Sequence, residues 1–237
     1  SCAYFSQEYK RRSMANDNYE AVIVGTGFSG VCAGIKLKEA GIENFVILER
    51  ADDIGGTWRD NDYPGAACDV ASHLYSFSFE PNPNWSRMFS PQQEIYDYTM
   101  HCIEKYDLKK YIRFGQEMIG GEFNEESGMW TVKTSQGNEY VTRFWVNGLG
   151  PLNRPVFPKI LGLQGFKGKM FHSSKWDHSF EPKGKKVAVI GTGASAIQIV
   201  PALVKDVEQL YLFQRTPAWV IPKPDRDMRK VEKWLFK

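Results

Sequence analysis

Two copies of one glycine-rich turn constrain this 237-residue chain more than any other feature of its sequence. Residues 25–30 read G-x-G-x-x-G, and residues 191–196 read G-x-G-x-x-A. Each turn follows a short apolar run and precedes a segment with helical periodicity, which predicts a strand, a tight turn and a helix. Such a turn brings backbone amides close to a pyrophosphate at the positive end of the helix. The sequence therefore predicts an α/β fold with two Rossmann-like dinucleotide-binding domains, the second incomplete in this chain.

The first repeat has the composition of a complete β-α-β unit. Residues 19–24 predict a strand, residues 31–40 a helix, and residues 44–48 a second strand that ends in Glu49. Glu49 follows Gly25 by 49 − 25 = 24 residues, which is where an acid accepts a hydrogen bond from a ribose hydroxyl. This context favours nucleotide binding, whereas an isolated glycine motif would be weak evidence.

The segment after the first repeat is rich in glycine and aromatic residues. Gly55 and Gly56 either let the backbone approach a ligand or form an ordinary surface turn. Residues 63–79 suit the wall of a site for a flat ring, although such aromatic residues are more often part of a core. Further elements are predicted at residues 92–105 (a helix), 129–133 and 139–143 (an antiparallel pair of strands) and 144–147 (another strand).

The second repeat reproduces the spacing of the first. Residues 186–190 predict a strand, residues 196–204 a helix and residues 209–214 a second strand. Arg215 follows that strand, and 215 − 191 again gives 24 residues from the first glycine of the turn.

The residue at this position differs in charge between the repeats, since Glu49 is acidic and Arg215 is basic. A carboxylate accepts from a ribose 2′-hydroxyl and repels a 2′-phosphate, whereas a guanidinium binds that phosphate as a fork. We therefore expect FAD at the first turn and NADPH at the second. An isolated arginine would be a solvated surface charge, but the register of Arg215 within a complete second turn favours phosphate binding.

Charge and cysteine content exclude several classes of protein. Thirty basic and 28 acidic residues give a net charge of +2, so no basic surface argues for a nucleic-acid partner. The four cysteines form no C-x-x-C pair, which argues against a zinc site and against a dithiol reductase. A reduced, cytoplasmic protein without a bound metal is expected.

No membrane-spanning or export segment is predicted. The longest uncharged run, residues 187–204, is interrupted by glycines and by Pro201. Residues 1–13 lack the apolar core of a signal peptide, and Met14 is a candidate initiator. Residues 227–237 predict a short basic helix with an apolar face, suited to a partner domain or to a membrane surface.

A third motif lies between the two repeats and joins them. Residues 166–177 read F-x-G-x-x-x-H-x-x-x-W-D and include His172 and Trp176; we call them the connecting motif. With both glycine turns in place, the chain resembles the class B flavoprotein monooxygenases, and the connecting motif is similar to the fingerprint of the Baeyer-Villiger monooxygenases in that class. The resemblance covers residues 19–224.

The resemblance implies a two-step reaction with O2 and a small-molecule ketone or other lipophilic substrate. NADPH reduces FAD, the reduced flavin captures O2 as a C4a-peroxide, and this peroxyflavin converts the ketone to an ester or lactone. By the same resemblance, Asp69 lies near the flavin and orients a catalytic arginine, while His172 and Trp176 relay domain movement.

The chain also departs from the pattern of that class. No residue of this chain matches that arginine, and Ala67 stands where related proteins often carry a basic residue. Members of that class are considerably longer, so we expect a piece of a longer protein or a truncated form.

Two other readings remain beside ketone oxidation. The same flavin chemistry serves the oxygenation of a sulfide, an amine or a hydrocarbon, and a truncated form would be a nucleotide-binding fragment without turnover.

The predicted segments are 1–18 (N-terminal extension), 19–150 (FAD-binding domain), 151–181 (linker with the connecting motif) and 182–237 (start of the NADPH-binding domain). Catalytic roles are predicted for Asp69, His172 and Trp176. The predicted cofactor-binding residues are Gly25, Gly27, Phe28, Ser29, Gly30, Glu49, Arg50, Gly56, Thr57, Trp58, Asp69, Tyr75, Gly191, Thr192, Gly193, Ser195, Ala196, Arg215 and Thr216.

Overall fold

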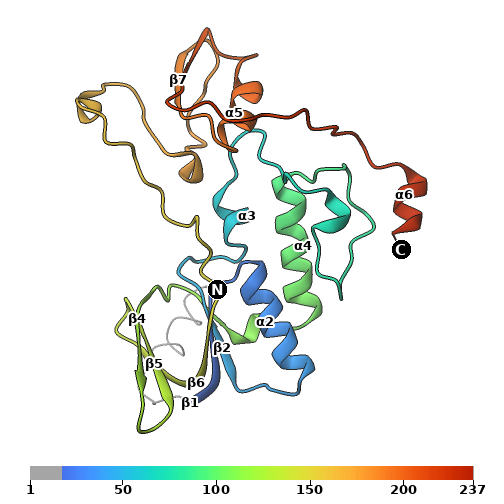
Figure 1. Cartoon of the computed structure of the whole chain (residues 1–237), viewed down its shortest axis with the longest axis vertical. Coiled ribbons are helices and arrows are strands. Elements are labelled where there is room, and N and C mark those ends of the chain that lie inside the picture. The colour runs from blue at the N-terminus through green and yellow to red at the C-terminus, as the bar shows by residue number, and fades with distance from the viewer. Residues whose placement is uncertain (1–17, 237) are drawn as a thin grey trace, which may run out of the picture. The chain divides into compact units, whose positions relative to one another are not determined.

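A computed structural model describes residues 18–236 of the chain (Figure 1). It forms two compact units. The first unit contains the described residues up to Gly56 together with Thr99–Pro151, and the second contains Thr57–Tyr98 together with the described residues from Leu152 onward. Residues 1–17 of the predicted N-terminal extension lie outside the described residues. The units divide the chain differently from the predicted domains, whose boundaries stay a prediction.

The first unit is built on a mixed six-stranded sheet. Its strands, in the spatial order β3-β2-β1-β6-β5-β4, are Ile112–Arg113, Phe45–Leu48, Asn18–Val24, Glu139–Asn147, Met129–Thr134 and Met118–Asn124. Strands β3, β2, β1 and β6 are parallel to one another, whereas β5 pairs antiparallel with both of its neighbours, β6 and β4. Helix α2, Phe28–Glu39, packs against β1, β2 and β6 (Figure 1).

The two central strands of the parallel part of this sheet, β1 and β2, are apolar because they are buried. Residues 21–24 of β1 and 45–48 of β2 are at most 3% exposed, because both faces of a parallel strand are covered. The predicted strands 19–24 and 44–48 and the predicted helix 31–40 are confirmed, although the helix begins three residues earlier, at Phe28. The α/β class is therefore confirmed.

In the antiparallel part of the sheet one expectation was wrong, and one strand was not predicted. The strands predicted at 139–143 and 144–147 form one strand, β6, because its first half pairs with β5 while residues 141–147 pair with β1. Strand β4 was not predicted, since Gly120 and Gly121 weaken its strand pattern. The ring of Trp145 from β6 fills the place of the absent side chain, as a Cβ at Gly121 would lie 3.0 Å from it.

The second unit contains the second β-α-β repeat. Strands β7, Lys186–Ile190, and β8, Gln209–Phe213, pair in parallel, and helix α5, Ala196–Leu203, connects them. All three agree with the predicted bounds to within one residue. Two strands and one helix are less than a full Rossmann domain, as the sequence predicted.

The remaining helices and turns complete the described chain. They are helix α3 (Thr57–Asp60), helix α4 (Gln92–Lys105), helix α6 (Lys230–Leu235) and the 3-10 turns η1 (Ser72–Leu74), η2 (Lys109–Tyr111), η3 (Leu163–Gly165) and η4 (Ser173–Lys175). The chain passes from the second unit back to the first within α4, whose predicted bounds are confirmed. None of the helices within residues 18–236 is long and apolar enough to cross a membrane.

Candidate functional site

The first glycine turn joins β1 to α2 through very close backbone contacts. Gly25 has φ +102°, a conformation that favours glycine, and its amide donates to the Leu48 carbonyl at 2.7 Å. A Cβ on Gly30 would lie 1.8 Å from the Gly25 carbonyl oxygen, so only a hydrogen fits there. A Cβ on Gly25 would in turn meet the Gly148 carbonyl at 2.6 Å. The turn is therefore packed between the ends of three strands and the start of α2.

Glu49 lies at the end of β2 with its carboxylate fixed by the turn. Its Oε2 accepts from the Thr26 amide at 3.0 Å and from the Thr26 hydroxyl at 2.5 Å. Its Oε1 accepts from the Ala51 amide at 2.9 Å, and the residue is 5% exposed. The acid predicted to meet a ribose thus also ties the turn to β2. The sequence analysis missed Thr26, although a hydroxyl inside the motif was a visible signal.

The backbone beside this turn fits a dinucleotide pyrophosphate. Gly27 caps α2 without a side-chain hydrogen bond, and no acid stands in the first turn of the helix, which includes Phe28 and Ser29. Gly55 has φ +108° and donates to the Thr26 carbonyl at 3.2 Å, which brings the glycine pair against the turn. Among the described residues, a Cβ on Gly27 would meet within 4 Å only the Cα of Gly56, at 4.0 Å. Bare backbone and a positive helix end are what a close-lying pyrophosphate requires.

Two aromatic side chains predicted to bind a cofactor contact each other in the second unit. The Trp58 indole Nε1 donates to the Tyr75 hydroxyl at 3.0 Å, and the rings meet edge to face. Burial raises the pKa of the Tyr75 hydroxyl above its ordinary value. Gln92 also donates to the Trp58 carbonyl, and Thr57 begins the same helix, α3. These contacts fix the orientation of the Trp58 indole.

The second glycine turn opens α5 in a similar way. Gly191 has φ +108°, and its amide donates to the Phe213 carbonyl at 2.9 Å. Thr192 accepts from the Gln214 side chain at 3.1 Å. Ser195 caps α5 without a side-chain hydrogen bond, and the space around Gly193 is open within the described part of the chain. This helix start, whose N-cap residue makes no side-chain hydrogen bond to the helix, also fits a pyrophosphate.

The remaining predicted residues of the second turn differ in exposure. Ala196, in the place of a third glycine, is 8% exposed and packed into the helix start. Arg215 and Thr216 follow β8 and are exposed. Arg50, beside Glu49 in the first unit, is partly buried.

Asp69 ends a loop, residues 63–69, that packs against α5. Its Oδ1 accepts from the Gln198 side chain at 3.2 Å. Tyr63, at the start of the loop, forms a buried cluster with Ile199 and Leu203 of α5. Trp176 of the connecting motif packs against this same cluster. The structure therefore brings Asp69 and Trp176 to one helix, and it adds Gln198, which the sequence analysis missed.

The connecting motif is held by contacts within itself. His172 Nδ1 accepts from the Ser174 amide at 3.1 Å and so caps η4. The ring of Phe166 lies over Gly168, where a Cβ would be 2.6 Å from ring atoms. Asp177 pairs with Lys169 at 2.6 Å, which closes the motif on itself. His172 and Trp176 thus lie in one locally ordered segment.

The Asp177 pairing predicts a dependence of stability on pH. Hydrogen bonds from Lys169 and then from Ser179 lower the pKa of Asp177 from 3.8 to about 2. A lowered pKa stabilises the folded state above the unfolded value, and this contribution disappears as the pH falls through the folded value. We expect Asp177→Asn to lower Tm at pH 7, and the difference from wild type to shrink as the pH falls below about 4 and to vanish below about 2. Thermal melts across this pH range measure it.

The exposed Asp206 is the matched control for this experiment. Asp206→Asn should change Tm little both at pH 7 and at low pH. A difference between wild type and Asp177→Asn that stays constant below pH 3 would contradict the ion-pair account.

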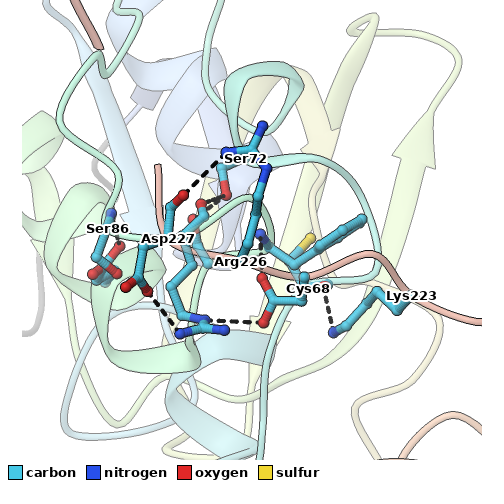
Figure 2. Close-up of polar contacts among 11 residues, drawn as sticks. Cys68, Ser72, Ser86, Lys223, Arg226 and Asp227 are labelled. Carbon is cyan, nitrogen blue, oxygen red and sulfur yellow. Dashed lines mark hydrogen bonds and ion pairs between the residues drawn. The ribbon is translucent and has the colours of Figure 1, made fainter. Parts of the chain in front are cut away.

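A C-terminal strap, residues 223–229, adds a short antiparallel pairing to the second unit. The Met88 amide donates to the Arg226 carbonyl at 2.9 Å, and the Met228 amide donates to the Ser86 carbonyl at 2.9 Å. Figure 2 shows this region, with Arg226 and Asp227 near Ser72 and Ser86. The strap begins seven residues after Thr216, so it follows the second repeat closely.

Charged side chains of the strap reinforce that pairing. Arg87 pairs with Asp225 and Asp227, each at 2.9 Å, and the hydrogen bond that Arg87 donates to the Asp225 carboxylate raises the pKa of Arg87. The Lys223 ammonium donates to the Cys68 carbonyl at 3.4 Å (Figure 2). The strap therefore touches the loop that carries Asp69. The sequence analysis missed it because no motif marks it.

Comparison with known proteins gives consistent results. Residues 19–228 match the family described as flavin-binding monooxygenase-like. A Baeyer-Villiger monooxygenase of Pseudomonas aeruginosa is 48% identical over 218 residues, which cover 92% of this chain and 41% of that protein.

Two solved structures share the fold. Cyclohexanone monooxygenase from Rhodococcus bound to NADP+ has a TM-score of 0.87 and 35% identity, with 93% of this chain and 42% of that one covered. OTEMO in complex with FAD and NADP has a TM-score of 0.86 and 32% identity, with 92% and 43% covered. The chain thus spans about two fifths of the length of these relatives.

Proposed function

The chain belongs to the flavin-binding monooxygenase-like family, and from this premise we propose that it carries the FAD site and the beginning of the NADPH site of a Baeyer-Villiger monooxygenase. The intact protein would use NADPH and O2 to insert one oxygen beside a ketone carbonyl, giving an ester or lactone, while the other oxygen leaves as water. The observation that carries this proposal is the complete connecting motif, residues 166–177, between two dinucleotide-type turns.

The first unit supplies the proposed FAD site. Gly25, Gly27 and Gly30 present backbone and the uncapped start of α2 to the pyrophosphate, and Glu49 is held at the end of β2. FAD, when bound and reduced, would supply the oxygen chemistry. The role of these residues is to bind the cofactor and to fix its orientation.

The second unit supplies the first part of the proposed NADPH site. The start of α5 would face the pyrophosphate, and Arg215 after β8 would bind the 2′-phosphate. Asp69, held by Gln198, would orient an arginine supplied by the rest of the intact protein. The proposed role of His172 and Trp176 is to transmit movement of the second unit, since one caps η4 and the other packs against the α5 cluster.

Isotope labelling tests the proposed reaction. The intact protein is incubated with NADPH, 18O2 and a panel of cyclic and linear ketones, and the products are identified by mass spectrometry. We expect esters or lactones that carry one 18O atom, and no product when NADPH is omitted. NADPH consumption with no ester from any ketone, but with oxygenated sulfides or amines, would contradict ketone oxidation and favour heteroatom oxygenation.

A further inference from the structure

Gln198 connects the helix of the second glycine turn to the loop that carries Asp69. Its Nε2 donates to the Ala67 carbonyl at 2.9 Å and to Asp69 Oδ1 at 3.2 Å. Its Oε1 accepts from the Tyr63 hydroxyl at 3.0 Å and from the Ala67 amide at 3.4 Å. A primary amide has two donor hydrogens and two acceptor lone pairs, so these four contacts use its full capacity. Such complete pairing fixes one orientation of the side chain.

The backbone of the loop lies directly on the same turn of α5. Gly65 has φ +83°, and a Cβ at this position would lie 2.7 Å from the Gln198 carbonyl oxygen. Beneath the contact, the side chains of Tyr63, Ile199 and Leu203 are between 3% and 8% exposed. Close backbone approach and a buried apolar cluster make the loop and α5 move together.

Gln198 also stands beside the place where a nucleotide would bind. It is the third residue of α5, two positions after Ala196 and three after the N-cap, Ser195. An anion bound at the start of α5 would order this first helical turn. The ordered turn would then restrain Ala67 and Asp69 through the hydrogen bonds of the Gln198 amide.

We propose that Gln198 is a positioning residue that couples occupation of the second nucleotide site to the loop 63–69 and to the Asp69 carboxylate. The inference rests on the proposed function, in which NADPH binds at the start of α5. The inference adds to that function a link between the NADPH site and the loop 63–69. The loop is also held from outside α5, because the Cys68 amide donates to the Ser90 carbonyl and the Cys68 carbonyl accepts from Lys223.

Hydrogen–deuterium exchange of residues 63–69, with and without NADP+, measures this coupling in the intact protein. NADP+ should slow exchange of the loop by roughly fivefold or more in wild type. Gln198→Glu keeps both acceptor contacts but loses both donor contacts, and Gln198→Met loses all four. In both variants NADP+ should still bind, and its effect on the loop should fall to less than about twofold. Gln209→Glu, on β8, is the matched control, because that amide donates to its neighbour Leu210 and not to the loop, and it should behave as wild type.

A charge swap separates coupling from simple loosening of the loop. Combining Gln198→Glu with Asp69→Asn restores a donor and an acceptor between the two side chains in reversed order. The double variant should recover at least about half of the NADP+ effect on exchange. If Gln198→Glu acted only by loosening the loop, the added Asp69→Asn substitution would not restore the effect.

Four outcomes would overturn the proposal. An NADP+ effect that survives in Gln198→Glu, or a double variant no better than Gln198→Glu, would rule out Gln198 as the link. Normal NADP+ binding to wild type without any change in loop exchange would rule out the coupling while leaving the proposed function intact. Absence of NADP+ binding to wild type would overturn both the coupling and the proposed function.

Discussion

Gly30→Ala is expected to destabilise the first unit by about 3 kcal/mol and to abolish flavin binding, because the added methyl group has no space. Its Cβ would lie 1.8 Å from the Gly25 carbonyl oxygen and 2.9 Å from the Gly25 carbonyl carbon. The turn cannot shift easily to relieve this contact, since the Gly25 amide donates a hydrogen bond to the Leu48 carbonyl and the Gly148 amide donates one to the Val24 carbonyl. Urea unfolding and the flavin absorbance of the purified protein measure the two effects.

Gly120→Ala is the matched control in the same unit. Gly120 lies in β4, and among the described residues nothing beyond its chain neighbours comes within 4 Å of a methyl group added there. The substitution should therefore change stability by less than about 0.5 kcal/mol. If Gly30→Ala unfolded at the same urea concentration as wild type and retained its flavin, the close contact of turn and helix would be refuted.

Arg215→Ala is expected to weaken NADPH binding by about 10- to 150-fold and to leave NADH binding nearly unchanged. The loss corresponds to charge-assisted hydrogen bonds worth roughly 1.5 to 3 kcal/mol, and NADH lacks the 2′-phosphate that would accept them. Arg215 is exposed two residues after the end of β8, so the substitution removes charge without opening a cavity in the core. Titration of the intact protein with each nucleotide gives the two dissociation constants.

Lys205→Ala provides the control for a general loss of positive charge. Lys205 is exposed after α5, and its removal should change the affinity for NADPH less than about threefold. Equal losses of NADPH and NADH affinity in Arg215→Ala would rule out the phosphate assignment.

The sequence predicted those helices and strands whose bounds are set by neighbouring residues in the chain. The bounds of β7 and of α4 were predicted without error, because apolar periodicity and adjacent breakers determine where they begin and end. The repeated spacing also placed Glu49 directly after β2 and Arg215 two residues after β8. Local pattern was sufficient for the framework of both glycine turns.

The features that the sequence did not predict depend on partners far along the chain. Strand β4 includes two glycines and forms because Trp145 fills the space above Gly121. Gln198 looks like any polar residue on a helix until the fold joins it to Ala67, 131 positions away in the sequence. The strap carrying Asp225 is likewise defined only by its pairing with Arg87. Such contacts carry no periodic signal, so only the folded chain shows them.

Anaerobic addition of NADPH to the intact protein tests the central claim most directly. We predict that the purified protein is yellow with bound flavin, that NADPH bleaches it, and that NADH does so much more slowly. When air and a ketone are then admitted together, the colour should return with one ester formed for each NADPH consumed. A protein that binds no flavin, or whose flavin NADPH does not bleach, would contradict the claim that this chain carries the cofactor sites of a Baeyer-Villiger monooxygenase.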